Sequence, residues 1–226
     1  MSKLKYMPFS EEIIFDDQFN SNVDDLPDFI TSIEFGLHFN QNVDHLPSSL
    51  KKLSLSFYFN KPLDNLPKGL EYLNIGHEFD YPLDNLPPNL KELCIGEDFN
   101  HPIDNLPSKL EVLVLGRYFN QRIDYLPESL KFLSVGNNFN QLIDNLPNNL
   151  KKLNLGNQFY QGNFFNQPID NLPDSIERLV IGNFFDQKIN KLPKNLKEMH
   201  IFRKKRKNYQ FFSLPDTNIE IKFNYD

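Results

Sequence analysis

The amino-acid sequence predicts a β-rich solenoid, a right-handed coil of about eleven short parallel strands with a 20-residue repeat and little helix. Three observations support this prediction: a phenylalanine recurs at every twentieth position, a Leu-Pro pair follows it, and an LxxLxL pattern comes next. Such internal periods are typical of solenoids. The phenylalanines are Phe19, Phe39, Phe59, Phe79, Phe99, Phe119 and Phe139, followed after a six-residue insertion by Phe165 and Phe185.

Each LxL triplet alternates apolar and variable residues, which indicates a strand with one buried face. A glycine often follows the triplet and permits a sharp turn. The proline after leucine excludes a helix interior or a central strand from that part of the unit. Successive coils should therefore pair their strands in parallel, about 4.8 Å apart, and cover one another's apolar sides. In a middle coil we expect these side chains to point inward: Leu50, Leu53, Leu55, Phe59, Leu63 and Leu66.

An asparagine follows most of the repeating phenylalanines, as Asn60 follows Phe59. An inward asparagine can satisfy backbone groups that an irregular turn leaves unpaired. We therefore expect a column of asparagines that ties neighbouring coils together.

The repeat organises residues 1–226 as a single solenoid domain. We expect residues 1–18 to form an N-terminal capping coil and residues 19–201 the repeat array, with the insertion near 157–164. Residues 202–226 then form a C-terminal cap that carries a basic run. Weakened copies at the ends give eleven strand positions, from Ile13–Phe15 to Ile219–Ile221, the last placed one repeat length after Met199–Ile201.

Composition narrows the class of protein. The net charge is −6, which gives no general reason to expect binding to nucleic acid or to an anionic membrane. The single cysteine, Cys94, excludes an internal disulfide and disfavours structural zinc. No secretory signal and no run of about 20 apolar residues is visible. These features predict a soluble intracellular protein of the cytoplasm, with no cofactor and no membrane association.

The unit LPxxLKxLxLG resembles the core of leucine-rich repeats, and the FN-x-P-[IL] element more specifically resembles the FNIP repeat. The resemblance extends over residues 7–201. Members of that family are found in giant DNA viruses and social amoebae, so it implies a viral or amoebal protein. It also implies an arc that binds proteins. Some members carry an F-box, which we do not expect here because only Met1–Tyr6 precede the first coil.

One acidic column offers a candidate metal site. It contains Asp24, Asp44, Asp64, Asp84, Asp104, Asp124, Asp144 and Asp170, and ends at Asn190. Calcium could compensate the repulsion between carboxylates about 5 Å apart. The alternative is that each aspartate accepts backbone N–H groups of its own turn. We favour the turn interpretation, because one aspartate per coil is a small ligand set, and therefore predict no metal.

A second column consists of charged residues before each strand: Lys51, Glu71, Lys91, Glu111, Lys131, Lys151, Glu177 and Lys197. The first five alternate in sign, which predicts attractive pairs between coils. Exposed pairs contribute roughly 0–1 kcal/mol each, so we expect a role in stability and register rather than in binding.

The variable strand positions are the candidate binding surface, because they should point away from the core. They include Glu92, Cys94, Lys152, Asn154, Val180 and His200. Apolar and arginine side chains on such a face are typical of interface anchors. The predicted partner contacts are Tyr72, Val112, Val114, Phe132 and Arg178. The alternative is that the apolar members only pack against adjacent strands.

The remaining candidate sites give weaker evidence of function. The basic run Arg203–Lys207 could be a nuclear localisation signal or a nucleic-acid patch, but a solvated end of the array is the favoured interpretation. The five histidines share no column, and no hydrolase, metalloprotease or phosphate-loop motif is present. We therefore predict a non-catalytic scaffold that binds a protein partner, not an enzyme.

Overall fold

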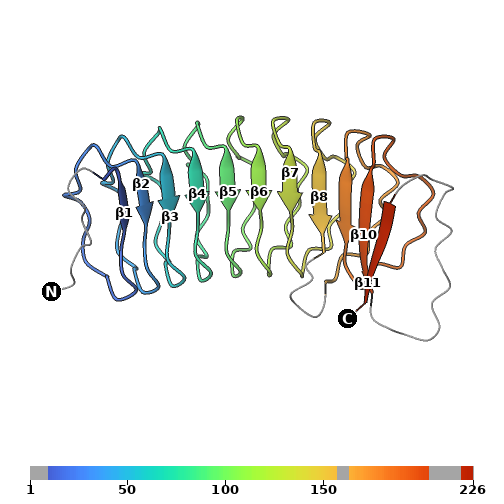
Figure 1. Cartoon of the computed structure of the whole chain (residues 1–226), viewed down its shortest axis with the longest axis horizontal. Helices are drawn as coiled ribbons and strands as arrows, with labels where there is room; N and C mark the ends of the chain where they lie inside the picture. Colours follow the sequence, from blue (N-terminus) through green and yellow to red (C-terminus); the bar gives the residue numbers. More distant parts are fainter. Residues whose placement is uncertain (1–9, 157–162, 204–219, 226) are drawn as a thin grey trace.

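The computed structural model describes residues 10–156, 163–203 and 220–225, which form one continuous sheet of parallel strands. Eleven strands lie side by side in sequence order (Figure 1). No helix occurs among the described residues, so the predicted β-solenoid is confirmed. The strands are β1 (Glu12–Ile14), β2 (Ser32–Glu34), β3 (Lys52–Ser54), β4 (Tyr72–Asn74), β5 (Glu92–Cys94), β6 (Val112–Val114), β7 (Phe132–Ser134), β8 (Lys152–Leu155), β9 (Arg178–Ile181), β10 (Glu198–Arg203) and β11 (Glu220–Tyr225).

The strand register repeats the sequence period. Leu53 of β3 lies opposite Leu73 of β4, and the same offset of one repeat holds from β1 to β8. The last pair differs, because Met199 of β10 lies opposite Ile221 of β11. The predicted register, which paired Met199 with Ile219, is therefore wrong by two positions.

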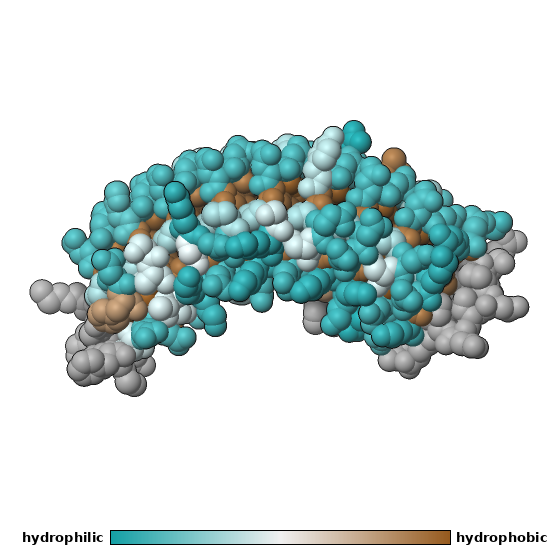
Figure 2. Space-filling view, turned by 90° about the horizontal axis from the view of Figure 1, so that it is seen from above, coloured by the Kyte–Doolittle hydropathy of each residue, from teal (hydrophilic) through white to brown (hydrophobic). Residues whose placement is uncertain are grey.

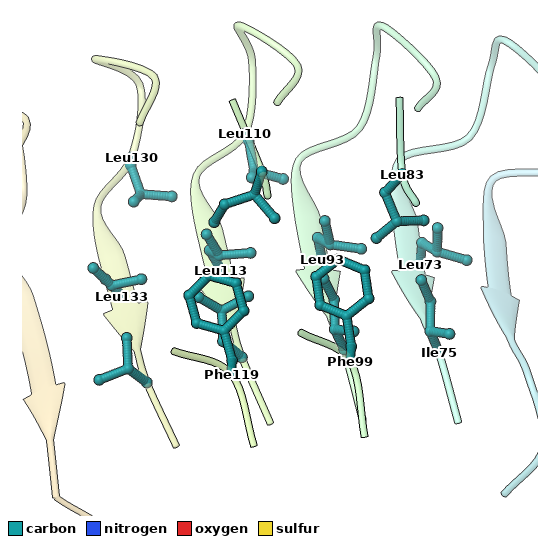
Figure 3. Close-up of a cluster of buried hydrophobic side chains, with 14 of the residues drawn as sticks. Leu73, Ile75, Leu83, Leu93, Phe99, Leu110, Leu113, Phe119, Leu130 and Leu133 are labelled. Atoms are coloured by element: carbon teal, nitrogen blue, oxygen red, sulfur yellow. The ribbon is translucent and has the colours of Figure 1, made fainter. Parts of the chain in front are cut away.

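The core consists of columns of equivalent side chains stacked along the solenoid. In the coil that contains β3, the six side chains predicted to point inward are all at least nine-tenths buried. Figure 3 shows the arrangement in the middle coils, where Leu93 and Leu113 lie on adjacent strands and Phe99 and Phe119 stack below them. Each coil thus covers its neighbour, as expected for a repeat too small to bury its own face.

The solenoid is curved, with the sheet on its inner side. Hydrogen-bonded parallel strands lie about 4.8 Å apart. The stacked phenylalanine rings of the same coils are 6.1–6.3 Å apart along the column from Phe19 to Phe185. Because the coils are more widely spaced on the phenylalanine side, the stack bends toward the strands, and Figure 2 shows the resulting arc from above.

Two tight turns close each coil. The Leu50 N–H donates to the Pro47 carbonyl at 3.0 Å, and the Phe59 N–H donates to the Ser56 carbonyl at 3.3 Å. Both bonds join residues three apart, which defines a β-turn. The second turn needs glycine in most coils because backbones are in contact there. A Cβ added at Gly116 would overlap the carbonyl oxygen of Gly96 in the coil before.

The asparagines that follow the phenylalanines form the predicted ladder between coils. The Oδ1 of Asn40 accepts the Asn60 backbone N–H at 3.0 Å, and the Oδ1 of Asn120 accepts that of Asn140 at 2.9 Å. The side-chain amide of Gln141 adds a second bond to the Asn120 Oδ1 at 3.1 Å. The predicted inward position is wrong, because these asparagines are half-buried or exposed. The bonds form at the rim of the coil, where each carbonyl can reach the next backbone.

Candidate protein-binding face

The strand face is the set of solvent-facing side chains on the strands, arranged in two columns. The first position of each three-residue strand and its equivalent in β8–β10 form one column, which contains Lys52, Tyr72, Glu92, Val112, Phe132, Lys152, Arg178 and Glu198. The second column contains Ser54, Asn74, Cys94, Val114, Ser134, Asn154, Val180 and His200. The face lies on the inner side of the arc, because the sheet does.

Three of the predicted contacts lie together. Val112 of β6 is directly opposite Phe132 of β7, and Val114 shares β6 with Val112. All three side chains are half-buried, so apolar surface reaches solvent while each packs against its strand neighbours. We call these residues the Val–Phe cluster. Lateral packing therefore holds the cluster in place while part of its surface is exposed to solvent, and the predicted partner contact stays a prediction.

Tyr72 does not join this cluster. It lies on β4, and Glu92 of β5 separates it from Val112 of β6. It lines a shallow open depression of about 450 Å³ together with Lys51, Lys52, Glu71, Lys91 and Glu92. Partial burial is the main cause that raises the pKa of the Tyr72 hydroxyl. Its surroundings are charged, in contrast to those of Phe132.

Arg178 lies on β9, two strands beyond Phe132, with Lys152 of β8 between them. Its Nε is 3.2 Å from the Oε2 of Glu198 on the next strand, and its side chain is 47% exposed. The Glu198 Oε1 is also 2.7 Å from the His200 Nε2. Arg178 is therefore oriented by a neighbour while its guanidinium remains accessible for a partner.

Cys94 is half-buried in the second column, between Asn74 and Val114. Burial raises the pKa of its thiol, and the nearby Glu92 carboxylate acts in the same direction. The thiolate is the reactive form of cysteine. The environment of Cys94 therefore favours the unreactive thiol.

The acidic column bonds mainly to the neighbouring coil rather than to the backbone of its own turn. Asp64 accepts the side-chain amide of Asn85 at 3.1 Å, and Asp144 accepts that of Asn171 at 3.1 Å. Asp170 accepts the Nδ2 and the backbone N–H of Asn190, which lowers the pKa of its carboxyl. The predicted bonds to each turn's own backbone are therefore wrong. Among the described residues, no group of three or more metal-ligating side chains is placed to hold an ion.

The charged column forms the predicted pairs between coils. Glu71 lies 2.6 Å from Lys91 and 3.8 Å from Lys51, and the hydrogen bond from Lys91 is the main cause that lowers the pKa of the Glu71 carboxyl. Glu177 likewise lies 2.6 Å from Lys197 and 3.4 Å from Lys151. Lys131 lies 2.8 Å from Glu111. All of these side chains are substantially exposed, so the pairs act mainly on register.

A second exposed group was not predicted from the sequence. His38 stacks on Tyr58 at 5.2 Å, and Phe57 stacks on His77 at 4.3 Å, in the turns that follow β2 to β4. Phe57 and Tyr58 are about two-fifths exposed. The signal in the sequence is the aromatic content of the two positions before the repeating phenylalanine, as in Phe57 and Tyr58. The basic run, by contrast, lies outside the described residues after Arg203, which ends β10.

A parallel solenoid of this kind, with a leucine core and a strand-lined inner face, defines a leucine-rich-repeat-like protein. The model of the FNIP repeat matches residues 19–58, 59–98, 99–138, 119–158 and 165–204. The chain therefore belongs to the FNIP repeat family. Among the described residues, no helix has the length and apolar character needed to cross a membrane.

Two solved structures are similar to the chain. One is CroV588, described as a novel circular leucine-rich-repeat protein, at 33% identity and a TM-score of 0.74; the match covers 96% of this chain and 37% of that one. The other is YopM from Yersinia enterocolitica WA-314, at 22% identity and a TM-score of 0.57, covering 88% of this chain and 47% of that one. The chain thus spans less than half the length of either neighbour. No curated protein matches it.

Proposed function

We propose that the chain is a non-catalytic recognition module that binds a partner protein through its strand face, with the Val–Phe cluster as the anchor. The observation that carries this proposal is the contiguous apolar surface formed by Val112, Val114 and Phe132 on adjacent strands. Leucine-rich-repeat-like solenoids offer extended concave surfaces for binding. Interface energy concentrates in a few central apolar or aromatic side chains.

The other sides of the coil also favour the strand face as the binding surface. The sides of the coil bond to neighbouring coils through the asparagine ladder, the Asp–Asn pairs and the charged column. The two face columns carry fewer such bonds, so their residue types are set less by the solenoid itself. Arg178 supplies directional hydrogen bonds at one edge of the contact, and Tyr72 adds apolar area at the other.

The test is affinity capture from host cells with wild type compared with Val112→Asp plus Phe132→Asp. We expect at least one partner to be lost with the double variant, because a carboxylate buried in an apolar contact costs several kcal/mol. The matched control is Tyr125→Asp plus Leu142→Asp, at side chains that are 72% and 57% exposed away from the strand face. Unaltered circular dichroism must accompany each variant. If no partner depends on Val112 and Phe132, the proposed face is wrong.

A further inference from the structure

The surface beside the Val–Phe cluster is positively charged, although the chain as a whole is negative. Strands β7 to β9, with the residue that precedes each strand, carry four cations and one anion, a local charge of +3 against −6 for the whole chain. The cations are Lys131, Lys151, Lys152 and Arg178, and the anion is Glu177. This local excess lies on the side of the cluster toward the C-terminus.

The cations differ in how far neighbours neutralise them. Lys131 pairs with Glu111 at 2.8 Å, and Lys151 shares Glu177 with Lys197. Arg178 lies 3.2 Å from Glu198, although its side chain is 47% exposed. Lys152, by contrast, forms no ion pair with any described residue, and its side chain is exposed directly beside Phe132 in the register. An exposed, unneutralised lysine next to an apolar cluster is a point where an acidic group of a partner would gain attraction.

The opposite side of the cluster has the reverse sign. Glu92 of β5 is exposed and lies directly beside Val112. Along one column the order is therefore anion, apolar, apolar, cation, cation, from Glu92 to Arg178. Strands lie about 4.8 Å apart, so the first cation is about 5 Å and the second about 10 Å beyond Phe132. Side chains of an extended peptide face the same side at every second residue, about 6.6 Å apart, which places a matching acidic residue two positions from its apolar one, between the two cations.

We infer that the partner segment is an acidic–hydrophobic peptide in extended conformation, which seats an apolar side chain on the Val–Phe cluster and places carboxylates over Lys152 and Arg178. This inference rests on the proposed function of the strand face. The acidic residues lie on one side only of the apolar residue, because Glu92 repels them on the other. Complementary charge of this kind fixes orientation and speeds association.

The experiment is selection of displayed random peptides on the immobilised full chain, with three variants as parallel baits. Lys152→Glu reverses the unneutralised cation and would also pair with Arg178, which removes both attractions. Lys61→Glu is the matched charge control, at an exposed lysine in the turn after Phe59. Val112→Asp plus Phe132→Asp removes the apolar anchor. Thermal unfolding of each bait checks that it is folded.

We expect wild type to select peptides with Asp or Glu two positions to one side of a large apolar residue, on the same face of the extended peptide. Individual peptides should bind Lys152→Glu about tenfold more weakly, and Lys61→Glu as tightly as wild type. Peptides that need Val112 and Phe132 but show no acidic bias, or no loss with Lys152→Glu, would overturn this inference and leave the proposed function standing. Selected peptides that do not need Val112 and Phe132 would overturn both.

Discussion

Replacing Asn120 with alanine tests the asparagine ladder at the centre of the solenoid. The Oδ1 of Asn120 accepts the Asn140 backbone N–H at 2.9 Å and the Gln141 Nε2 at 3.1 Å. Alanine leaves the Asn140 N–H without this acceptor, whereas Gln141 keeps its bond to the Asn120 carbonyl at 3.0 Å. The N–H of Asn140 is part-buried, and a typical hydrogen bond contributes about 0.5–1.5 kcal/mol, so we expect the free energy of unfolding to fall by about 1 kcal/mol.

The assay is urea unfolding followed by far-ultraviolet circular dichroism, with the midpoint and slope compared between variants. Asn105→Ala is the matched control, because Asn105 is exposed and forms no hydrogen bond with any described residue. Asn120→Asp keeps an acceptor oxygen for the Asn140 N–H and should lose less stability than Asn120→Ala. Equal stability of Asn120→Ala and Asn105→Ala, within about 0.5 kcal/mol, would refute the ladder as a source of stability.

Three further predictions concern the stacking of coils. Gly116→Ala should unfold at a markedly lower urea concentration, because its Cβ would overlap the Gly96 carbonyl oxygen. The control is Gly69→Ala, which should be tolerated because the nearest atom to its Cβ is the flexible Lys51 Nζ at 3.2 Å. Similar urea midpoints for the two variants would contradict backbone contact at the turn. Hydrogen bonds from Lys197 and Lys151 lower the pKa of Glu177 in the folded chain, so its stabilising contribution is full above the unfolded pKa and is lost over the acid range, as pH falls through the lower folded pKa. Glu177→Gln should therefore show a shallower fall of the urea midpoint over that range, and an unchanged slope would exclude the pairing. Finally, calcium and a chelator should leave the melting temperature unchanged, because Asn85 and Asn171 already occupy carboxylate oxygens of the acidic column; protection by calcium would revive the metal hypothesis.

The period made most of the fold predictable. Once Phe59 and Leu53 are known to have equivalents in every neighbouring repeat, translation along the axis fixes the strand order and the stacking of the core. The last register was missed because Lys205 stands where the repeating phenylalanine is expected, and Phe202 where the glycine is expected. The sequence nonetheless contained a signal for the longer offset. The pair Leu214–Pro215 follows Leu192–Pro193 at a separation two residues longer than the repeat, and Met199 pairs with Ile221 at the same separation.

The side-chain partners were harder to predict than the backbone. We assigned each aspartate to its own turn, whereas Asp64 bonds to Asn85 in the next coil. Sequence neighbours suggest local turns, but in a solenoid the nearest group in space often belongs to the adjacent coil. The same reasoning separates Tyr72 from Val112, since they lie two strands apart with Glu92 between them. Which side chains share a patch depends on single substitutions within a column, and these follow no period.

Curvature gives the strand face a further advantage for binding. Equivalent positions are about 4.8 Å apart on the strand side, and the phenylalanines behind them are 6.2 Å apart between Phe99 and Phe119. A partner segment about 20 Å long would therefore contact side chains of about four coils on the inner side but only about three at the phenylalanine spacing. Each added coil contributes two face positions, so the inner side presents more independent side chains per unit length of partner. A short partner segment that spans Val112 to Arg178 can thus be recognised by four successive coils at once.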